Sequence, residues 1–250
     1  MRSAFGILTV AAFATAGCIG ERCGPPTELP AERAHLLRPD SSIFRQTPPD
    51  TFLVAMQTSR GEIVIQVVRE WSPLGAWRFY NLVRTGFFDG ARFYRVLPGF
   101  AAQFGASGIP DVEAAWRDKS IPADPIRVSN TRGMVTFAQG EPDSRSTQLF
   151  INLRDNPQLD EKNFAPIGRV ISGWDAVSSL NGRYGELKPR GDGPLWRCVY
   201  TSGNQYLSAK YPDLDSIIRT DVTGVADVAD TTAVRPDTAR SATSTGPALP

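Results

Sequence analysis

Residues 93–105 read FYRVLPGFAAQFG, two short apolar runs joined by a Pro98-Gly99 turn, and this stretch decides the fold. Side chains of a strand alternate between two faces, so Arg95 shares a face with Phe93 and Leu97. A permanent cation in an apolar row either extends its head group to water or serves a site where it has a partner. The stretch predicts two strands, and it leaves open whether Arg95 is a snorkelling or a functional residue.

Composition limits the classes of function. The chain has 250 residues, 41% of them hydrophobic, which suffices for one sizeable core or two small ones. Lys and Arg total 27 against 26 Asp and Glu, a balance that gives no electrostatic support for nucleic acid or an anionic membrane surface as a partner. A single histidine and three cysteines without zinc-ribbon spacing predict no metal site.

The two ends of the chain differ in composition from its middle. Residues 1–18 hold Arg2, a short apolar run and Cys18, and they predict a secretory signal whose end resembles a lipobox, with lipidation at Cys18. Residues 19–50 carry six prolines and are expected to be a linker with a short helix at 31–37. Residues 220–250 have no aromatic residue and are expected to be a disordered tail.

Between these ends, alternating β-rich runs and turn signals predict a barrel with few helices. Ser72-Pro73 is a typical helix start, and Gly86 can end that helix. Expected strands are 51–57, 62–68, 92–97, 101–104, 133–138, 148–152, 165–170 and the LWRCVY run at 195–200. Further helical segments are expected at 174–180 and 206–218.

Three segments place polar residues inside apolar strands: Phe93–Gln103, Phe137–Gly140 and Thr147–Asn152. A half-buried polar group beside aromatic rings is costly unless it has a partner. Several such groups together indicate a groove that binds something both apolar and amide-like. A main chain around a proline fits that description.

On these motifs, F-x-R-V-x-P-G-F-x-x-Q followed by T-Q-x-F-I-N, the sequence resembles the cyclophilin-type peptidyl-prolyl isomerases, from about Thr51 to Ile218. The resemblance implies a mainly β domain over 51–219: a closed eight-stranded antiparallel barrel capped by two helices, with a C-terminal helical extension. It also implies catalysis of X-Pro rotation on proline-containing polypeptides, without metal or cofactor. The signal predicts that this occurs outside the cytoplasm, in the periplasm or on a lipid anchor.

The resemblance also implies roles for ten residues. Arg95, Gln103 and Phe100 are the expected catalytic residues, with Arg95 donating to the prolyl nitrogen and Gln103 positioning it. The expected substrate-binding residues are Ala101, Ala138, Gln139, Gln148, Phe150, Leu159 and Phe164. Three departures alter the pocket: Ala101 stands where a methionine is usual, Gln158 where many eukaryotic members carry a tryptophan, and Phe164 where many members carry a histidine.

Some alternatives stay open at this point. The chain could be a catalytically weak cyclophilin-like peptide-binding or assembly module, which Ala101 favours and the retained Arg95 disfavours. A monomer with no nucleic-acid partner is expected, touching a membrane only through Cys18. If Cys18 is acylated, Cys23 and Cys198 remain, and in an exported protein they either form a disulfide or stay free.

Overall fold

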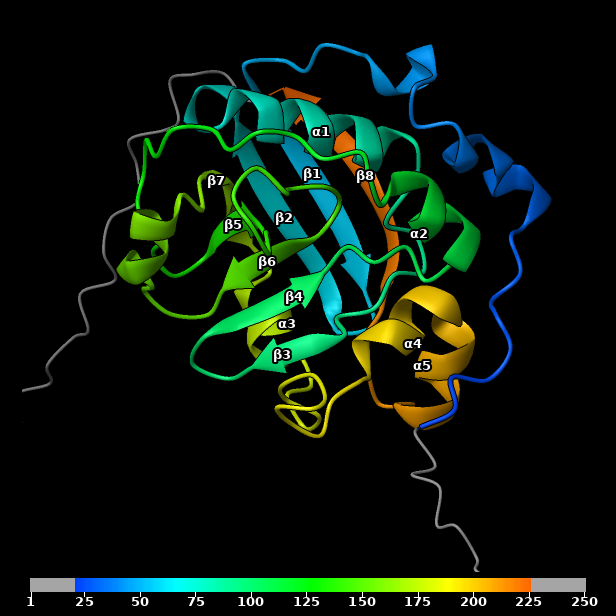
Figure 1. Ribbon diagram of the computed structural model, residues 1–250. Helices are drawn as coiled ribbons and strands as arrows, with labels where there is room; N and C mark the ends of the chain where they lie inside the picture. Colours follow the sequence, from blue (N-terminus) through cyan, green and yellow to red (C-terminus); the bar gives the residue numbers. More distant parts are fainter. Residues whose placement is uncertain (1–20, 226–250) are drawn as a thin grey trace, which may run out of the picture.

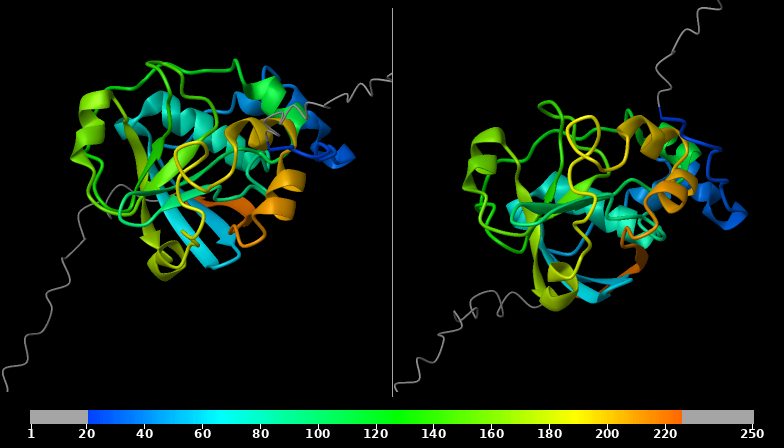
Figure 2. Two further views of the ribbon diagram at one scale, coloured as in Figure 1. Left: turned by 60° about the horizontal axis from the view of Figure 1, so that its bottom comes forward. Right: turned by 90° about the horizontal axis from the view of Figure 1, so that it is seen from below.

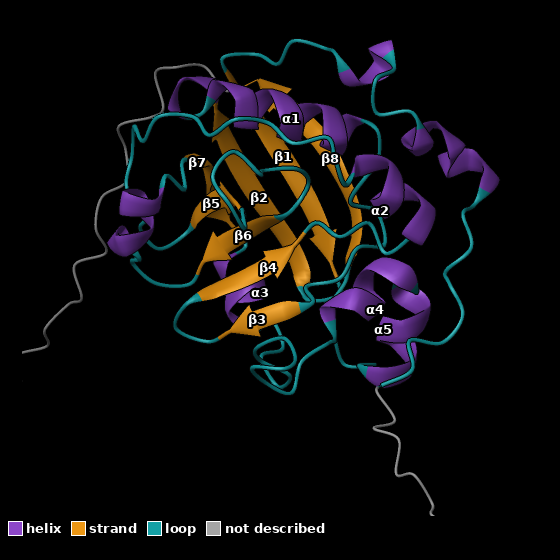
Figure 3. Cartoon of the chain, in the orientation of Figure 1, coloured by secondary structure: helices purple, strands orange, loops and turns teal. Residues whose placement is uncertain are grey.

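The computed structural model describes residues 21–225, a curled sheet with helices at its rim and one face (Figures 1 and 3). The expected signal with Cys18, and residues 226–250 of the expected tail, lie outside the described residues. The strands are β1 (Thr51–Thr58), β2 (Gly61–Val68), β3 (Arg95–Leu97), β4 (Ala101–Phe104), β5 (Met134–Phe137), β6 (Leu149–Asn152), β7 (Pro166–Ser172) and β8 (Ile217–Val225). The α-helices are α1 (Pro73–Arg84), α2 (Pro110–Trp116), α3 (Trp174–Ser178), α4 (Trp196–Thr201) and α5 (Asn204–Lys210).

The eight strands form one antiparallel sheet in the order β3-β4-β6-β5-β7-β2-β1-β8. The edge strands β3 and β8 are not joined by a continuous ladder. A single bridge between Arg92 and Ser216 links the chain beside them. The closed barrel expected from the sequence is therefore not confirmed, and the sheet is a curled half-barrel.

The main core lies between the sheet and α1. Ser72 and Pro73 start this helix, and Ala76, Phe79 and Leu82 recur on its inner face, all fully buried. They pack in one cluster with inward side chains of β1 and β2 such as Phe52 and Ile65. Apolar residues recur every three to four positions in α1 and alternate with other residues in the strands. These two patterns explain why the sequence predicted α1, β1 and β2 at nearly their true bounds.

The proline-rich segment before β1 belongs to the domain and is not a free linker from residue 21 onward, which corrects the sequence expectation. Ala31–Leu37 and Ser42–Phe44 form 3-10 helices. Leu36 and Phe44 are buried in the main core, and the indole N–H of Trp116 donates to the carbonyl of Leu36 at 2.8 Å. The views in Figure 2 show the segment lying along the rim beside α4 and α5.

The C-terminal part differs most from the sequence expectation. Residues 196–201 form α4 and not a strand, because this run packs one side, Cys198 and Val199, into a second core with Tyr206 and Leu207. Residues 217–225 form β8, which pairs with β1, so the domain ends later than residue 219 and residues 220–225 are not tail. Cys23 and Cys198 form a disulfide with 4.8 Å between their Cα atoms. None of the helices within 21–225 is long and apolar enough to cross a membrane.

Candidate active site

The register of three strands aligns the central residues of the site. Arg95 of β3 lies directly opposite Gln103 of β4, and Gln103 lies opposite Phe150 of β6. Directly opposed residues of antiparallel strands share a face and have Cβ atoms about 4.5–5.5 Å apart. The backbone ladder therefore fixes a cation, an amide and an aromatic ring in one row on the outer face of the sheet.

The last residue of this row, Phe150, belongs to an apolar cluster separate from the main core. Ala101, Phe150 and Leu159 are its buried members, and Phe100, Ala138 and Phe164 pack against them. The rings of Phe150 and Phe164 meet edge to face with centroids 6.0 Å apart. A small apolar cluster on the outside of a sheet, next to polar groups, provides a pocket for a compact apolar group such as a proline ring.

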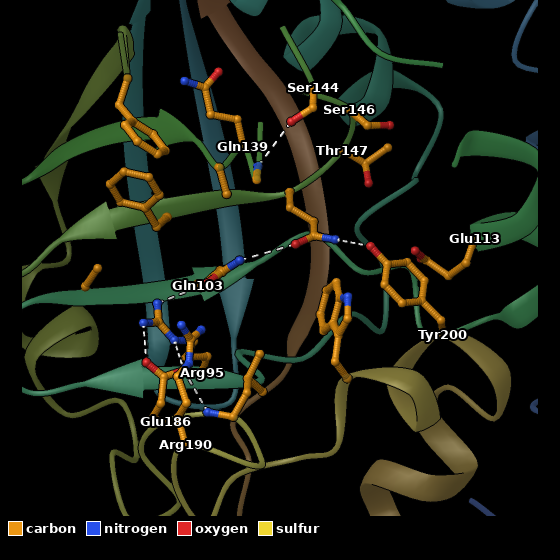
Figure 4. A pocket seen from close by; sticks show the side chains of 18 of the residues that line it. Arg95, Gln103, Glu113, Gln139, Ser144, Ser146, Thr147, Glu186, Arg190 and Tyr200 are labelled. Atoms are coloured by element: carbon orange, nitrogen blue, oxygen red, sulfur yellow. Dashed lines mark hydrogen bonds and ion pairs between the residues drawn. The ribbon is translucent and has the colours of Figure 1, made fainter. Parts of the chain in front are cut away.

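A groove of about 950 Å³ contains this cluster and the row of polar residues. All ten residues expected from the sequence line it: Arg95, Phe100, Ala101, Gln103, Ala138, Gln139, Gln148, Phe150, Leu159 and Phe164. The structure thus places them together, and their roles in binding and catalysis stay predictions. Figure 4 shows the polar members along the groove.

A directed chain of hydrogen bonds runs along the groove floor. Arg95 Nη1 donates to Gln103 Oε1 at 3.2 Å, and Gln103 Nε2 donates to Gln148 Oε1 at 3.2 Å. Gln148 Nε2 then donates to the Tyr200 hydroxyl at 2.7 Å (Figure 4). Tyr94 OH also donates to Gln148 Oε1 at 2.7 Å. Because each amide oxygen faces a donor, the orientation of both glutamines follows from Arg95 at one end.

Glu186 is a site residue that the sequence reasoning missed. It lies in the loop between α3 and α4, and its carboxylate accepts from Arg95 Nε at 2.7 Å and from Arg95 Nη2 at 2.6 Å. The hydrogen bond from Arg95 is the largest cause holding the pKa of Glu186 below its usual value, so this carboxylate is ionised at neutral pH. The loop has no strand or helix periodicity, and no sequence signal pointed to this contact.

The opposite wall of the groove is built around Gln139. Its Nε2 donates to the carbonyl of Lys162 at 2.9 Å, while its Oε1 is buried and has no hydrogen-bond partner within residues 21–225. The preceding N–H, of Ala138, donates to the carbonyl of Gln148 at 2.9 Å and ties this wall to β6. Gln139 is thus held in the groove wall by its amide N–H, and its amide oxygen is an unpaired acceptor among the described residues.

The far end of the groove is formed by α2 and α4, neither of which the sequence reasoning assigned to the site. Glu113 and Trp116 come from α2, and Trp196 and Tyr200 from α4. Burial raises the pKa of Glu113 to about 7, against the opposing effect of its hydrogen bond from Ser107. Within residues 21–225, no group of three or more His, Cys, Asp or Glu side chains is placed to hold a metal ion.

Comparison with known proteins gives one consistent family. Residues 53–195 match the family described as cyclophilin type peptidyl-prolyl cis-trans isomerase/CLD. A peptidyl-prolyl cis-trans isomerase of Acinetobacter baylyi is 33% identical over 139 residues, which cover 51% of this chain and 71% of that protein. One from Schizosaccharomyces pombe is 34% identical over 132 residues, covering 51% of this chain and 83% of that protein.

Among solved structures, a cyclophilin type peptidyl-prolyl cis-trans isomerase of Cryptosporidium parvum superposes with a TM-score of 0.53. It is 15% identical, and the match covers 70% of this chain and 99% of that one. At this identity the likeness concerns the fold, which is the same curled antiparallel sheet.

Proposed function

The chain belongs to the cyclophilin-type peptidyl-prolyl cis-trans isomerase family and is an enzyme of that activity, and we propose that it acts outside the cytoplasm on folding polypeptides through the groove around Arg95. The single observation that carries the assignment of the site is the row of Arg95, Gln103 and Phe150 beside the apolar cluster. A solved relative from Cryptosporidium parvum was determined in the presence of the dipeptide Ala-Pro, a ligand of the chemistry this groove suits.

The reaction needs no bond to be made or broken. The amide before proline resists rotation with a barrier of about 18–20 kcal/mol because resonance gives its C–N bond double-bond character. Rotation removes that resonance and leaves a lone pair on the prolyl nitrogen. Arg95 donates a hydrogen bond to this lone pair, which exists only in the twisted state, so the interaction favours the transition state over both planar forms.

One such bond is insufficient by itself. A charge-assisted hydrogen bond contributes about 1.5–3 kcal/mol net, whereas an acceleration of about five decades requires about 7 kcal/mol. The remainder comes from how the groove holds the two ends of the amide. The apolar cluster fixes the proline ring, and the Gln139 wall pairs with the main chain before it, so the groove fits a twisted amide better than a planar one.

The test is acceleration of cis–trans exchange in an Ala-Pro peptide, measured by NMR exchange spectroscopy without added metal. The full chain should accelerate exchange, and Arg95→Ala should reduce kcat/KM by at least about tenfold, a loss of one strong hydrogen bond. Arg183→Ala is the matched control, since Arg183 is exposed and lies outside the groove lining. Exchange no faster than in buffer would refute the activity, and an unaffected Arg95→Ala would refute the role of Arg95.

Export rests on two observations. Residues 1–18 carry Arg2, a short apolar run and Cys18, the pattern of a signal with a lipobox-like end. The Cys23–Cys198 disulfide supports an oxidising compartment, where such bonds persist. On these two observations we propose that the chain is exported and acylated at Cys18. Mass spectrometry of the mature N-terminus tests the anchor, and an N-terminal Cys18 without acyl chains would refute it.

A further inference from the structure

We infer that Glu186 is a positioning residue for Arg95 in the isomerisation. The inference deepens the proposed function and rests on it, because it concerns how the donor to the prolyl nitrogen is held. The Glu186 carboxylate accepts hydrogen bonds from Arg95 Nε at 2.7 Å and from Arg95 Nη2 at 2.6 Å (Figure 4). This bidentate geometry is the one that best fixes the orientation of an arginine side chain. The two side chains are 18% and 24% exposed, so the pair is largely shielded from water.

The loop holds Glu186 independently of Arg95. The N–H of Leu187 donates to Glu186 Oε1 at 2.8 Å, and the N–H of Gly193 donates to the Glu186 carbonyl at 2.8 Å. A Cβ on Gly191 or Gly193 would come within 2.5 or 2.6 Å of that carbonyl oxygen, so only glycine permits the loop to close so tightly. The carboxylate is thus presented by its own loop and does not depend on the arginine for its place.

The loop is also tied to the rest of the domain through Lys188, which itself lines the groove. Lys188 forms an ion pair with Glu21 at 2.6 Å, and Glu21 Oε1 accepts from the hydroxyl of Tyr206 at 2.8 Å. Two residues from Glu21, Cys23 is bonded to Cys198 of α4. These contacts brace the loop against the second core, so Glu186 can hold the guanidinium in one orientation and does not simply move with it.

The hydrogen bonds of Arg95 leave a defined pair of donors. A guanidinium has five N–H groups. Glu186 takes the one on Nε and one on Nη2, and Gln103 takes one on Nη1. Within the described residues, one N–H on Nη1 and one on Nη2 therefore remain for the substrate. Without Glu186, only the 3.2 Å bond to Gln103 and the ring of Phe100, 5.9 Å from the guanidinium carbon, would restrain a side chain with large rotamer entropy.

This arrangement predicts which kinetic constant depends on Glu186. An arginine held in position before the amide twists contributes mainly to the transition state, so its loss of order lowers kcat and leaves KM nearly unchanged. The alternative is that the ion pair holds Arg95 away from the substrate. Removing the Glu186 carboxylate would then raise kcat. The sign of the change therefore separates positioning from inhibition.

The experiment compares Glu186→Ala and Glu186→Gln with Asp192→Asn. Asp192 is an exposed acidic residue of the same loop, and it forms no ion pair with any residue of the described part of the chain. We expect Glu186→Ala to lower kcat about tenfold with KM within about twofold. Glu186→Gln keeps an oxygen that can accept from Arg95 and should recover part of the loss, and Asp192→Asn should match the wild type. The Arg95 Nε–H resonance should be sharp and downfield in wild type and Asp192→Asn, and shifted or broadened in Glu186→Ala.

The outcomes separate this inference from the proposed function. A wild-type chain with no activity refutes the function itself. An active wild type with Glu186→Ala at or above its kcat refutes positioning, as does a loss confined to KM or an equal loss in Asp192→Asn. An unchanged Arg95 Nε–H resonance in Glu186→Ala refutes it independently of any activity measurement.

Discussion

Arg95 and Gln103 lie directly opposite each other on β3 and β4, and Arg95 Nη1 donates to Gln103 Oε1 at 3.2 Å. Strand register fixes the Cβ atoms of the two residues opposite each other, so the distance between these Cβ atoms is as rigid as the sheet. The Gln103 amide N–H in turn donates to the side-chain oxygen of Gln148, which fixes the orientation of the Gln148 amide. Arg95, Gln103 and Gln148 therefore form one hydrogen-bonded network on the groove floor, in which each side chain donates to the next one away from Arg95.

Truncation of Gln103 tests whether this hydrogen-bonded network contributes to catalysis. We expect Gln103→Ala to lower kcat/KM about tenfold, because Arg95 loses a partner and the main chain of the substrate loses a hydrogen bond. Gln205→Ala is the control, since Gln205 is exposed on α5 and lies outside the groove lining. Peptide exchange rates for both variants check this, and equal activities would contradict the role of Gln103.

The sheet residues of the site could be predicted because period-two alternation and the F-x-R-V-x-P-G-F-x-x-Q motif fix both their face and their order. Arg95, Gln103 and Phe150 come from three neighbouring strands, and register brings them together without further information. The same alternation predicted most strand bounds to within a residue or two. Closure of the barrel could not be predicted, since it depends on pairing between the ends of the sheet, which no local pattern encodes.

Other parts could not be predicted for identifiable reasons. Glu186 reaches Arg95 across 91 positions from an irregular loop, and a contact of that kind has no periodicity. The LWRCVY run holds β-prone residues but is helical because tertiary packing of Cys198 and Val199 overrides local propensity. Strand β8, IIRTDVTGV, holds as many polar as apolar residues and shows no clean alternation, so its place depends on pairing with β1.

Stability should depend on pH through Glu113. Burial raises the pKa of Glu113 to about 7, from the 4.5 of an unperturbed glutamate. The folded state therefore binds a proton that the unfolded chain releases, and the stabilisation present below pH 4.5 is lost as the pH rises to about 7. Urea unfolding should show a free energy at pH 8 lower than at pH 5 by about 3 kcal/mol at most from this group.

Glu113→Gln isolates this effect, because its amide oxygen can still accept the hydrogen bond from the N–H of Ser107. The variant should lose most of the difference between pH 5 and pH 8, whereas Glu161→Gln, at an exposed position, should keep it. The neighbouring Arg117 and Tyr200 remain in place in both variants. An identical pH dependence in Glu113→Gln and wild type would show that Glu113 is not the group responsible.

The charges at the groove rim predict a preference among peptides. Arg117, Lys162 and Arg190 line the groove and are exposed, while Glu186 is paired with Arg95 and Glu113 is buried. Proline peptides carrying glutamate beside the Ala-Pro unit should therefore have a higher kcat/KM than those carrying lysine, by up to about fivefold for an exposed pair. The difference should shrink at high salt, where such pairs are screened.

A charge reversal at the rim checks that preference. Lys162→Glu should reduce or invert the ratio of the two peptides' kcat/KM values, and Lys210→Glu should leave it unchanged, because Lys210 is an exposed lysine of α5 outside the groove lining. A ratio that is equal to one in wild type at low salt would rule out electrostatic selection by this groove.

Removal of the Cys23–Cys198 disulfide should destabilise the fold. The bond joins residues 175 positions apart, and it supports contacts such as Thr27 Oγ1 donating to the Ser202 carbonyl at 2.9 Å. Closing so long a loop reduces the entropy of the unfolded chain, and loss of a native bridge costs about 2–5 kcal/mol. Urea midpoints should fall when the wild type is reduced and in the Cys23→Ser/Cys198→Ser variant, which should then be insensitive to reductant. If reduction left the wild-type midpoint unchanged, or if both thiols of the non-reduced, denatured protein reacted with a label, the bridge would not contribute as argued.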